Sequence, residues 1–327
     1  MRRRDFITLV GGATAWPLAA RAQQAAMPVI GYLGISSPDA FASRLEAFRQ
    51  GLSETGYHEG RNVTIEFRWA ENKFDRLPAL ASDLVGRRPS TIVAAGSTAG
   101  ALAVKAATTT IPIVFETGID PIAAGLVPSL NRPGGNITGV TSLNVVVNPK
   151  RLELLRELKP DVKAVGLLVN PTNPSVTGPA LLEMQAAART LGLELHILQA
   201  STDADIDPVF TRLPQLGAGG LVIVSEPFFV SRGERLAALA LRHRVPAIFY
   251  TREFAAAGGL ASYGGDVTES HRLCGRYAGR ILKGEKPADL PVQQVTRVEL
   301  IINLKTAKSL GLDVPRTLIA RADEVIE

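Results

Sequence analysis

The 327-residue chain contains one cysteine, Cys274, so it cannot form an intramolecular disulfide. We expect Cys274 to pack in the core from a helix. The four histidines have no metal-site spacing, and the G-x-S-x-G, P-loop and G-x-G-x-x-G motifs are missing. The sequence therefore predicts no metal, no cofactor and no enzyme activity.

Long apolar runs are also missing from the interior of the chain, where no stretch reaches the ~18–20 residues that a membrane span needs. Hydrophobic residues make up 46% of the chain and charged residues 20%, which is ordinary for a packed α/β protein. The length exceeds the usual domain size of about 100–200 residues, so we expect two lobes.

The N-terminus has the order of an export signal. Arg2–Arg4 precede an apolar run, Thr8–Ala20, and Ala20-Arg21-Ala22 matches a cleavage site. Residues 1–22 are predicted to be a signal peptide, with the twin-arginine route favoured over the general one. The alternative is a short N-terminal helix of a cytosolic protein. No cysteine follows the apolar run, so we expect a periplasmic protein without a lipid anchor.

Removal of this segment takes away four arginines and one aspartate, which lowers the net charge from +5 to +2. No basic patch with interleaved aromatic residues remains, so nucleic-acid binding is not expected.

Strand-like and helix-like segments alternate from residue 27 onward, which predicts βαβ units and parallel sheets. The fold class is α/β, with two Rossmann-like lobes joined by a hinge of several strands. Chain crossings are expected near Thr141, near Ser262 and within residues 292–302. The expected division is 27–141 plus 263–291 for lobe one and 142–262 for lobe two, with 292–327 as a crossing strand and C-terminal helix of open lobe assignment.

The stretch Thr110–Ser142 is central to these predictions. A short strand ends at Phe115 and is followed by Glu116, Thr117 and Asp120, and then by a predicted short helix. Ligands in open α/β sheets sit outside the carboxyl ends of strands, so this stretch predicts one wall of a binding cleft and the first hinge segment.

Three sets of residues together resemble one protein family. They are Asp120-Pro121 with Ala124–Val127, Pro133–Val140 and Ile302–Ala307. The set resembles the tryptophan/tyrosine-type ABC transporter substrate-binding proteins from Val29 to roughly Leu312. The resemblance implies a type 1 periplasmic binding fold, a small-molecule solute held between the lobes and delivery to an ABC permease in the inner membrane.

The resemblance also implies some site positions. Small polar residues after the third strand match Ser97 and Thr98, the Asp-Pro pair matches Asp120, and an asparagine of lobe two matches Asn170 or Asn173. The amino-acid binders of the family have an acidic residue at the position of Ser142. They have an Asp-Asn pair at the position of Ser225-Glu226.

Several candidates have a second, structural interpretation. Ser97 and Asp266 could bind solute or only cap the helices that follow them. Glu116 could pair with a ligand ammonium or with a basic side chain across the hinge. We expect one ring of Phe228-Phe229, placed in a loop, to face the cleft as a stacking wall. The predicted ligand-binding residues are Ser36, Ser97, Thr98, Thr117, Asp120, Ser142, Asn170, Asn173, Glu226, Phe228, Tyr250 and Asp266.

The sequence thus predicts a monomeric solute-binding protein of an ABC importer that captures an amino acid, an aromatic acid or another small polar organic molecule. Two alternatives stay open. The same fold could feed a signalling receptor as a ligand sensor, or the scaffold could carry an exported hydrolase or isomerase.

Overall fold

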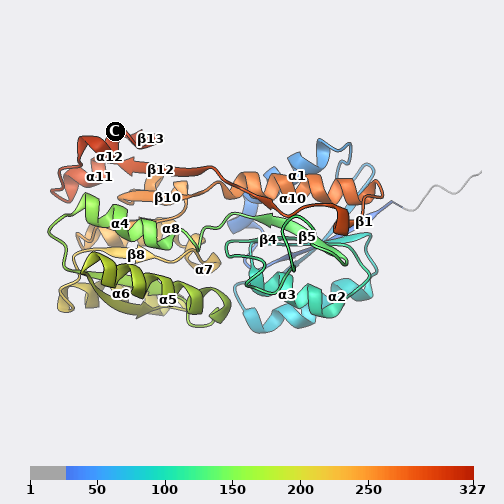
Figure 1. Cartoon of the computed structure of the whole chain (residues 1–327), viewed down its shortest axis with the longest axis horizontal. Helices are drawn as coiled ribbons and strands as arrows, with labels where there is room; N and C mark the ends of the chain where they lie inside the picture. Colours follow the sequence, from blue (N-terminus) through green and yellow to red (C-terminus); the bar gives the residue numbers. More distant parts are fainter. Residues whose placement is uncertain (1–26) are drawn as a thin grey trace, which may run out of the picture.

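The protein is described by a computed structural model that covers residues 27–327. The expected export signal, residues 1–22, lies outside the described part of the chain. Two α/β lobes lie side by side along the long axis of the molecule (Figure 1). None of the helices in residues 27–327 is long and apolar enough to cross a membrane.

The first lobe is built on a six-stranded sheet in which all strands are parallel. In spatial order its strands are β11 (Gln293–Gln294), β5 (Ile137–Thr141), β4 (Ile113–Thr117), β3 (Thr91–Ala95), β1 (Val29–Gly34) and β2 (Thr64–Trp69). Its α-helices are α1 (Ala42–Ser53), α2 (Leu77–Gly86), α3 (Thr98–Ala107) and α10 (Val267–Leu282). The central strands β3, β4 and β5 are buried along their whole length, as expected for a parallel sheet with helices on both faces.

The second lobe is built on a seven-stranded mixed sheet. In spatial order its strands are β13 (Glu324–Ile326), β12 (Val298–Asn303), β10 (Ala261–Gly265), β9 (Ala247–Phe249), β8 (Leu221–Ile223), β6 (Ala164–Val169) and β7 (Glu194–Gln199). Its helices are α4 (Asn148–Leu158), α5 (Pro174–Leu191), α6 (Asp203–Gln215), α7 (Pro227–Val230), α8 (Gly233–Arg242), α9 (Arg252–Ala256), α11 (Leu304–Ser309) and α12 (Arg316–Ile319).

The two-lobed α/β architecture expected from the sequence is confirmed, with one difference in pairing. β12 runs antiparallel to β10, so the second sheet is not wholly parallel. The difference arises because the chain enters β12 directly from the first lobe, without the helical crossover that joins parallel neighbours.

Three chain segments connect the lobes: one between β5 and α4, one between β10 and α10, and one between β11 and β12. Residues 263–265, which we expected in lobe one, belong to β10 of the second sheet. Asn144 joins the first two segments, because its Oδ1 accepts the Gly265 N–H at 2.7 Å and its Nδ2 donates to the Gly265 carbonyl at 3.3 Å. The Val295 N–H donates to the Thr141 carbonyl at 2.9 Å and ties the third segment to the first.

Two local expectations are wrong. Residues 121–126 form a series of turns rather than a helix, because the Asp120 carboxylate accepts the Ile122 N–H and because Gly125 has a φ of 71°. The aromatic pair Phe228-Phe229 lies in the short helix α7 rather than in a loop, and both rings are buried.

In lobe one, α10 packs very closely on α1 at paired glycines. A Cβ atom on Gly275 would lie 2.1 Å from the Phe48 carbonyl oxygen, and one on Gly51 would lie 1.8 Å from the Arg272 carbonyl oxygen. Cys274 lies on α10 in the core of this lobe, as expected.

Candidate functional site

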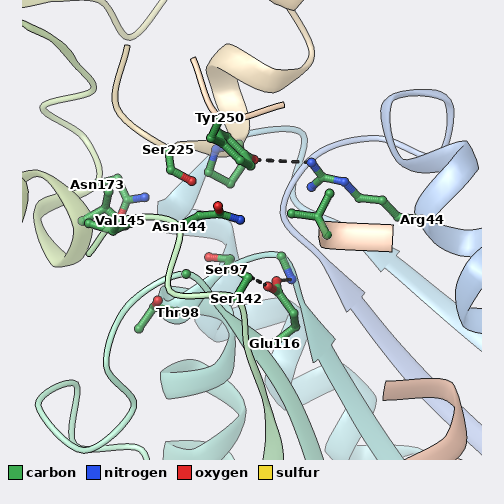
Figure 2. Close-up of a pocket in the computed structure, with 15 residues that line it drawn as sticks. Arg44, Ser97, Thr98, Glu116, Ser142, Asn144, Val145, Asn173, Ser225 and Tyr250 are labelled. Atoms are coloured by element: carbon green, nitrogen blue, oxygen red, sulfur yellow. Dashed lines mark hydrogen bonds between the residues drawn. The ribbon is translucent and has the colours of Figure 1, made fainter. Parts of the chain in front are cut away.

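A small cavity lies between the lobes, at the carboxyl ends of the strands of both sheets (Figure 2). Its volume is about 40 Å³, and its polar lining residues are Arg44, Ser97, Thr98, Glu116, Ser142, Asn144, Asn173, Ser225 and Tyr250. By volume it has room for about three water molecules, at roughly 10–15 Å³ each. The lobes are therefore closed around it.

The first wall is the N-terminus of α3. Ser97 is the N-cap of this helix, and its hydroxyl accepts the Gly100 N–H at 3.2 Å. Thr98 begins the helix, and its hydroxyl oxygen lies 2.6 Å from that of Thr117 at the end of β4. The positive end of the helix dipole and the hydroxyl groups favour a bound anion such as a carboxylate.

The second wall is Glu116, one residue before the end of β4, which is 5% exposed. Its Oε2 accepts the Gly96 N–H at 3.0 Å and its Oε1 accepts the Ser142 hydroxyl at 3.2 Å. Burial raises the pKa of Glu116, whereas the nearby Arg44 and these two donors oppose that rise. A cation entering the cavity would stabilise the charged form of this carboxyl group and offset the cost of its burial.

The third wall joins the two lobes directly. Arg44 of α1 is buried, and its guanidinium donates to the Tyr250 hydroxyl of the second lobe at 3.4 Å (Figure 2). Its guanidinium lies 4.7 Å from the centre of the Phe41 ring. The bond between Arg44 and Tyr250 exists only when the lobes are close together.

The remaining wall comes from the second lobe and the first connecting segment. Asn173 precedes α5, and Ser225 follows β8. The Asn173 amide donates to Glu226 Oε1 at 3.4 Å, which holds the amide at the cavity edge. Asn144 and Val145 approach from the connecting segment, and the Val145 N–H donates to the Gly118 carbonyl at 2.8 Å.

Five of the predicted ligand-binding residues line this cavity: Ser97, Thr98, Ser142, Asn173 and Tyr250. Three more support its walls from behind. Thr117 contacts the Thr98 hydroxyl, Asn170 accepts the Thr172 N–H at 3.0 Å, and Glu226 caps α7 by accepting the Phe228 N–H at 2.7 Å.

The other four predicted residues lie elsewhere. Ser36 is buried behind the end of β1, where it accepts a hydrogen bond from Asn72 at 3.4 Å. Phe228 packs against Phe229 and lies under the Arg232 guanidinium, so no ring of this pair stacks in the cavity. Asp120 forms a turn with the Ile122 N–H, and Asp266 caps α10 through the Thr268 N–H at 2.8 Å.

Arg44, Asn144 and Val145 line the cavity but are not predicted from the sequence. The sequence does contain a signal for Arg44, because it shares the buried face of α1 with Leu45 and Phe48, and a charge on a core-facing stripe needs a partner. Asn144 and Val145 lie in an irregular segment, where no periodicity indicates the direction of a side chain.

The cavity thus offers an anion-binding helix end, a buried carboxyl group, a guanidinium and several hydroxyl and amide groups. Within residues 27–327, no group of three or more His, Cys, Asp or Glu side chains is arranged to hold a metal ion. The arrangement suits a small molecule that carries charges of both signs.

A model of the ABC transporter substrate-binding protein family matches residues 30–326. A tyrosine-binding protein of Clostridioides difficile is 29% identical over 270 residues, which cover 82% of this chain and 76% of that protein.

Two solved structures are close in fold. A conserved domain protein from Vibrio cholerae is 27% identical with a TM-score of 0.83, and an ABC domain from Streptococcus pneumonia in complex with L-Trp is 26% identical with a TM-score of 0.81. Each match covers 91% of this chain and 99% of the other.

A third structure, the ligand-free, open form of a substrate-binding protein with adhesive properties from Clostridium difficile, is 25% identical over the same shares of both chains. Its TM-score is only 0.64. Identity and coverage are almost equal for the Trp-bound and the open structures, so the backbone arrangement of this chain is more similar to the Trp-bound structure than to the open one.

The family match spans nearly all of the described residues. This chain belongs to the family of ABC transporter substrate-binding proteins.

Proposed function

We propose that this protein binds an α-amino acid in the cavity between its lobes and delivers it to an ABC importer in the inner membrane. The observation that carries the proposal is the pairing of a helix N-terminus with a buried carboxyl group across one small cavity. An α-amino acid presents a carboxylate and an ammonium on the same carbon atom, which matches these two features.

The solute carboxylate is assigned to the α3 end of the cavity. Ser97 and Thr98 offer hydroxyl groups there, and the helix dipole adds a favourable field. Arg44 provides a guanidinium on the same side of the interface between the lobes, and hydrogen bonds between ions are the stronger ones in a buried site.

The solute ammonium is assigned to Glu116, with the Ser142 hydroxyl beside it. Burial raises the pKa of Glu116, and a bound ammonium holds the carboxylate in its charged form because opposite charges at close range stabilise each other. Binding therefore supplies the charge partner that the buried carboxylate favours.

Solute binding is coupled to closure of the lobes. Ser97, Thr98 and Glu116 belong to lobe one, whereas Asn173, Ser225 and Tyr250 belong to lobe two. A solute that contacts both sets binds the closed form more tightly and shifts the population toward it. A cavity of about 40 Å³ admits a solute only after the lobes separate, since ligand pockets usually measure about 300–1,000 Å³.

The similar proteins support an amino-acid solute. One relative is named a tyrosine-binding protein, and one similar structure holds L-Trp. We further propose that the protein acts as a monomer outside the inner membrane, after export through residues 1–22, and that its closed form docks on a permease.

The proposal is tested by isothermal titration calorimetry of the purified protein, starting at Gln23, against the twenty amino acids and a set of aromatic acids without an amino group. We expect micromolar or tighter binding of at least one amino acid and none of the acids. Binding of an acid without an amino group, or of no amino acid, would contradict the proposal.

A Glu116→Gln variant tests the assigned role. Gln keeps the size of the side chain and removes its charge, so we expect the solute Kd to rise by about tenfold to a hundredfold, the value of one hydrogen bond to a charged group. Glu157→Gln is the control, because Glu157 pairs with Arg321 on the surface at 2.8 Å. Equal Kd values for the two variants would show that Glu116 does not face the ammonium.

A further inference from the structure

Arg151 is a buried arginine that the proposed function does not use. It lies on α4, and its exposed fraction is 0%. Within residues 27–327 its hydrogen-bond partners are neutral oxygen atoms, and the groups that act on its pKa are two tyrosines rather than a carboxylate. Burial lowers the pKa of Arg151 to about 9, so the guanidinium keeps its charge at neutral pH. A buried charge without a counter-ion costs free energy, so the fold keeps this side chain at a cost.

The Arg151 guanidinium joins two elements of lobe two that border the hinge. Its Nε donates to the carbonyl oxygen of Tyr263 in β10 at 2.6 Å, and its Nη1 donates to the side-chain oxygen of Asn148 at the start of α4. β10 leads into the second connecting segment, and α4 follows the first one. Arg151 therefore fixes the lobe-two ends of two of the three connecting segments relative to each other.

The same guanidinium lies over the ring of Tyr250. Its central carbon atom is 5.7 Å from the ring centre, which is within the range of about 6 Å for a cation–π contact. Phe249 packs edge-to-face on this ring with 4.8 Å between the ring centres. The backbone of Tyr250 is held as well, because a Cβ atom on Gly264 of β10 would lie 2.3 Å from the Tyr250 carbonyl oxygen. These contacts restrain both the backbone and the ring of Tyr250.

Tyr250 connects lobe two to Arg44 of lobe one. Tyr250 lines the cavity, and its hydroxyl accepts a hydrogen bond from the Arg44 guanidinium at 3.4 Å (Figure 2). The tyrosine therefore lies between two guanidinium groups, with Arg44 at its hydroxyl and Arg151 at its ring. The direction of the hydroxyl depends on the orientation of the ring, so a contact that fixes the ring also fixes the acceptor that Arg44 meets.

The contacts of Arg151 lie within one lobe. Tyr263, Asn148 and Tyr250 all belong to lobe two, so separation of the lobes leaves these contacts in place. The Arg44–Tyr250 hydrogen bond, in contrast, forms only when the lobes are close together. Arg151 therefore orients Tyr250 before Arg44 arrives, and a preorganised partner loses less conformational freedom on closure.

Stability alone does not account for Arg151. Its Nη2 atom is buried and has no hydrogen-bond partner among the described residues, and the same holds for Nδ2 of Asn148 beside it. Buried donors without acceptors lower stability, and they add to the cost of the buried charge. A role in the orientation of Tyr250 gives a functional gain that offsets this cost.

We infer that Arg151 is a positioning residue for solute capture: it fixes the ring of Tyr250, and through the Arg44–Tyr250 hydrogen bond it favours the closed form. Arg151 acts through Tyr250 and lies outside the cavity lining. The inference rests on the proposed function in one respect, namely that the closed form is the one that holds the solute. Loss of Arg151 should therefore raise the open fraction and weaken solute binding.

The first test is a double-mutant cycle on the Kd for L-tryptophan, which one similar structure holds. Arg151→Met removes the cation and its donors but keeps a long apolar stem, whereas Tyr250→Phe keeps the ring and removes the hydroxyl. We expect Arg151→Met to raise the Kd about tenfold in the wild-type background. In the Tyr250→Phe background the same substitution should change nothing further, because no hydroxyl remains to be positioned.

Arg156→Met is the matched control, because Arg156 is exposed on the same helix, and it should keep the wild-type Kd. If Arg151→Met does not fold, Arg151→Lys takes its place in the cycle. Lysine keeps a cation but loses the planar fork that spans Tyr263 and Asn148, so we expect a smaller rise that also disappears without the Tyr250 hydroxyl. An unchanged Kd, or an equal rise in both backgrounds, would overturn the inference, since a merely structural arginine does not depend on that hydroxyl.

A second test needs no solute. With fluorotyrosine in place of the five tyrosines, ¹⁹F NMR reports on Tyr250, whose resonance is assigned by its loss in Tyr250→Phe. We expect one sharp resonance in the wild type and in Arg156→Met, and a broadened or split one in Arg151→Met. An equally sharp resonance in Arg151→Met would overturn the inference. If no amino acid binds the wild type but the resonance broadens as expected, the proposed function fails and the positioning of Tyr250 by Arg151 stands.

Discussion

Glu226 shows how one buried group can make stability depend on pH. This carboxyl group is 1% exposed, and burial raises its pKa from 4.5 to about 7, although the Phe228 N–H and the amides of Asn170 and Asn173 oppose the rise. Between these pH values the folded protein binds the proton that the unfolded chain has lost. The free energy of unfolding therefore falls as pH rises through this window, by roughly 3 kcal/mol at most.

Glu226→Gln removes this titration. We expect the variant to show a flatter dependence of unfolding free energy on pH between 5 and 8, and to be more stable than the wild type at pH 8. Urea unfolding at a series of pH values measures both. If the unfolding free energies of the two proteins changed with pH in parallel, a group other than Glu226 would be responsible for the pH dependence.

At the residue scale, the sequence predicted which polar residues lie near the strand ends better than it predicted the direction of their side chains. Ser97, Thr98, Asn173 and Tyr250 follow strands or begin helices, and the carboxyl ends of the strands bring them to one edge. Asp120 and Asp266 meet the same criterion, yet their side chains cap the backbone that follows them. Sequence does not distinguish these outcomes, because capping and binding favour the same residue types at the same positions.

At the scale of elements, the contact between α1 and α10 is the tightest constraint in lobe one. The helices approach so closely that a Cβ on Gly275 would overlap the Phe48 carbonyl oxygen. Gly178 is a useful contrast, because it lies inside α5 with no atom within 4 Å of a Cβ placed there.

Gly275→Ala should therefore cost much more stability than Gly178→Ala. The first forces two helices apart and should cost at least about 1–3 kcal/mol of unfolding free energy. The second should stay within about 0.5 kcal/mol of the wild type, since the helix propensity of alanine is offset by the contact of its Cβ with the following Pro179. Chemical denaturation measures both variants. An unchanged unfolding free energy for Gly275→Ala would show that the two helices can separate without a loss of stability.

Elements were predictable where periodicity was clear and the connections were short. The alternation of strands with helices gave both lobes, because each segment carries its own apolar pattern. The antiparallel strand β12 and the placement of residues 263–265 in β10 were missed, because they depend on which lobe the chain enters next. That choice is made by tertiary contacts, such as those of Asn144 with Gly265.

At the scale of the whole molecule, three connecting segments restrict the lobes to opening and closing about one hinge. The Arg44–Tyr250 hydrogen bond and the cavity walls form only in the closed arrangement. The lower TM-score to the open Clostridium difficile structure than to the Trp-bound Streptococcus pneumonia structure agrees with a closed form here.

The most direct test of the account is the distance between the lobes with and without solute. Spin labels on Ser43→Cys and Glu234→Cys lie on opposite walls of the groove beside Arg44, and Cys274 is buried in the core. Pulsed electron paramagnetic resonance then reports the separation. We expect a long or broad distance distribution without solute and a single shorter distance with a saturating amino acid. A distribution that stays the same while calorimetry shows saturation would contradict solute-driven closure.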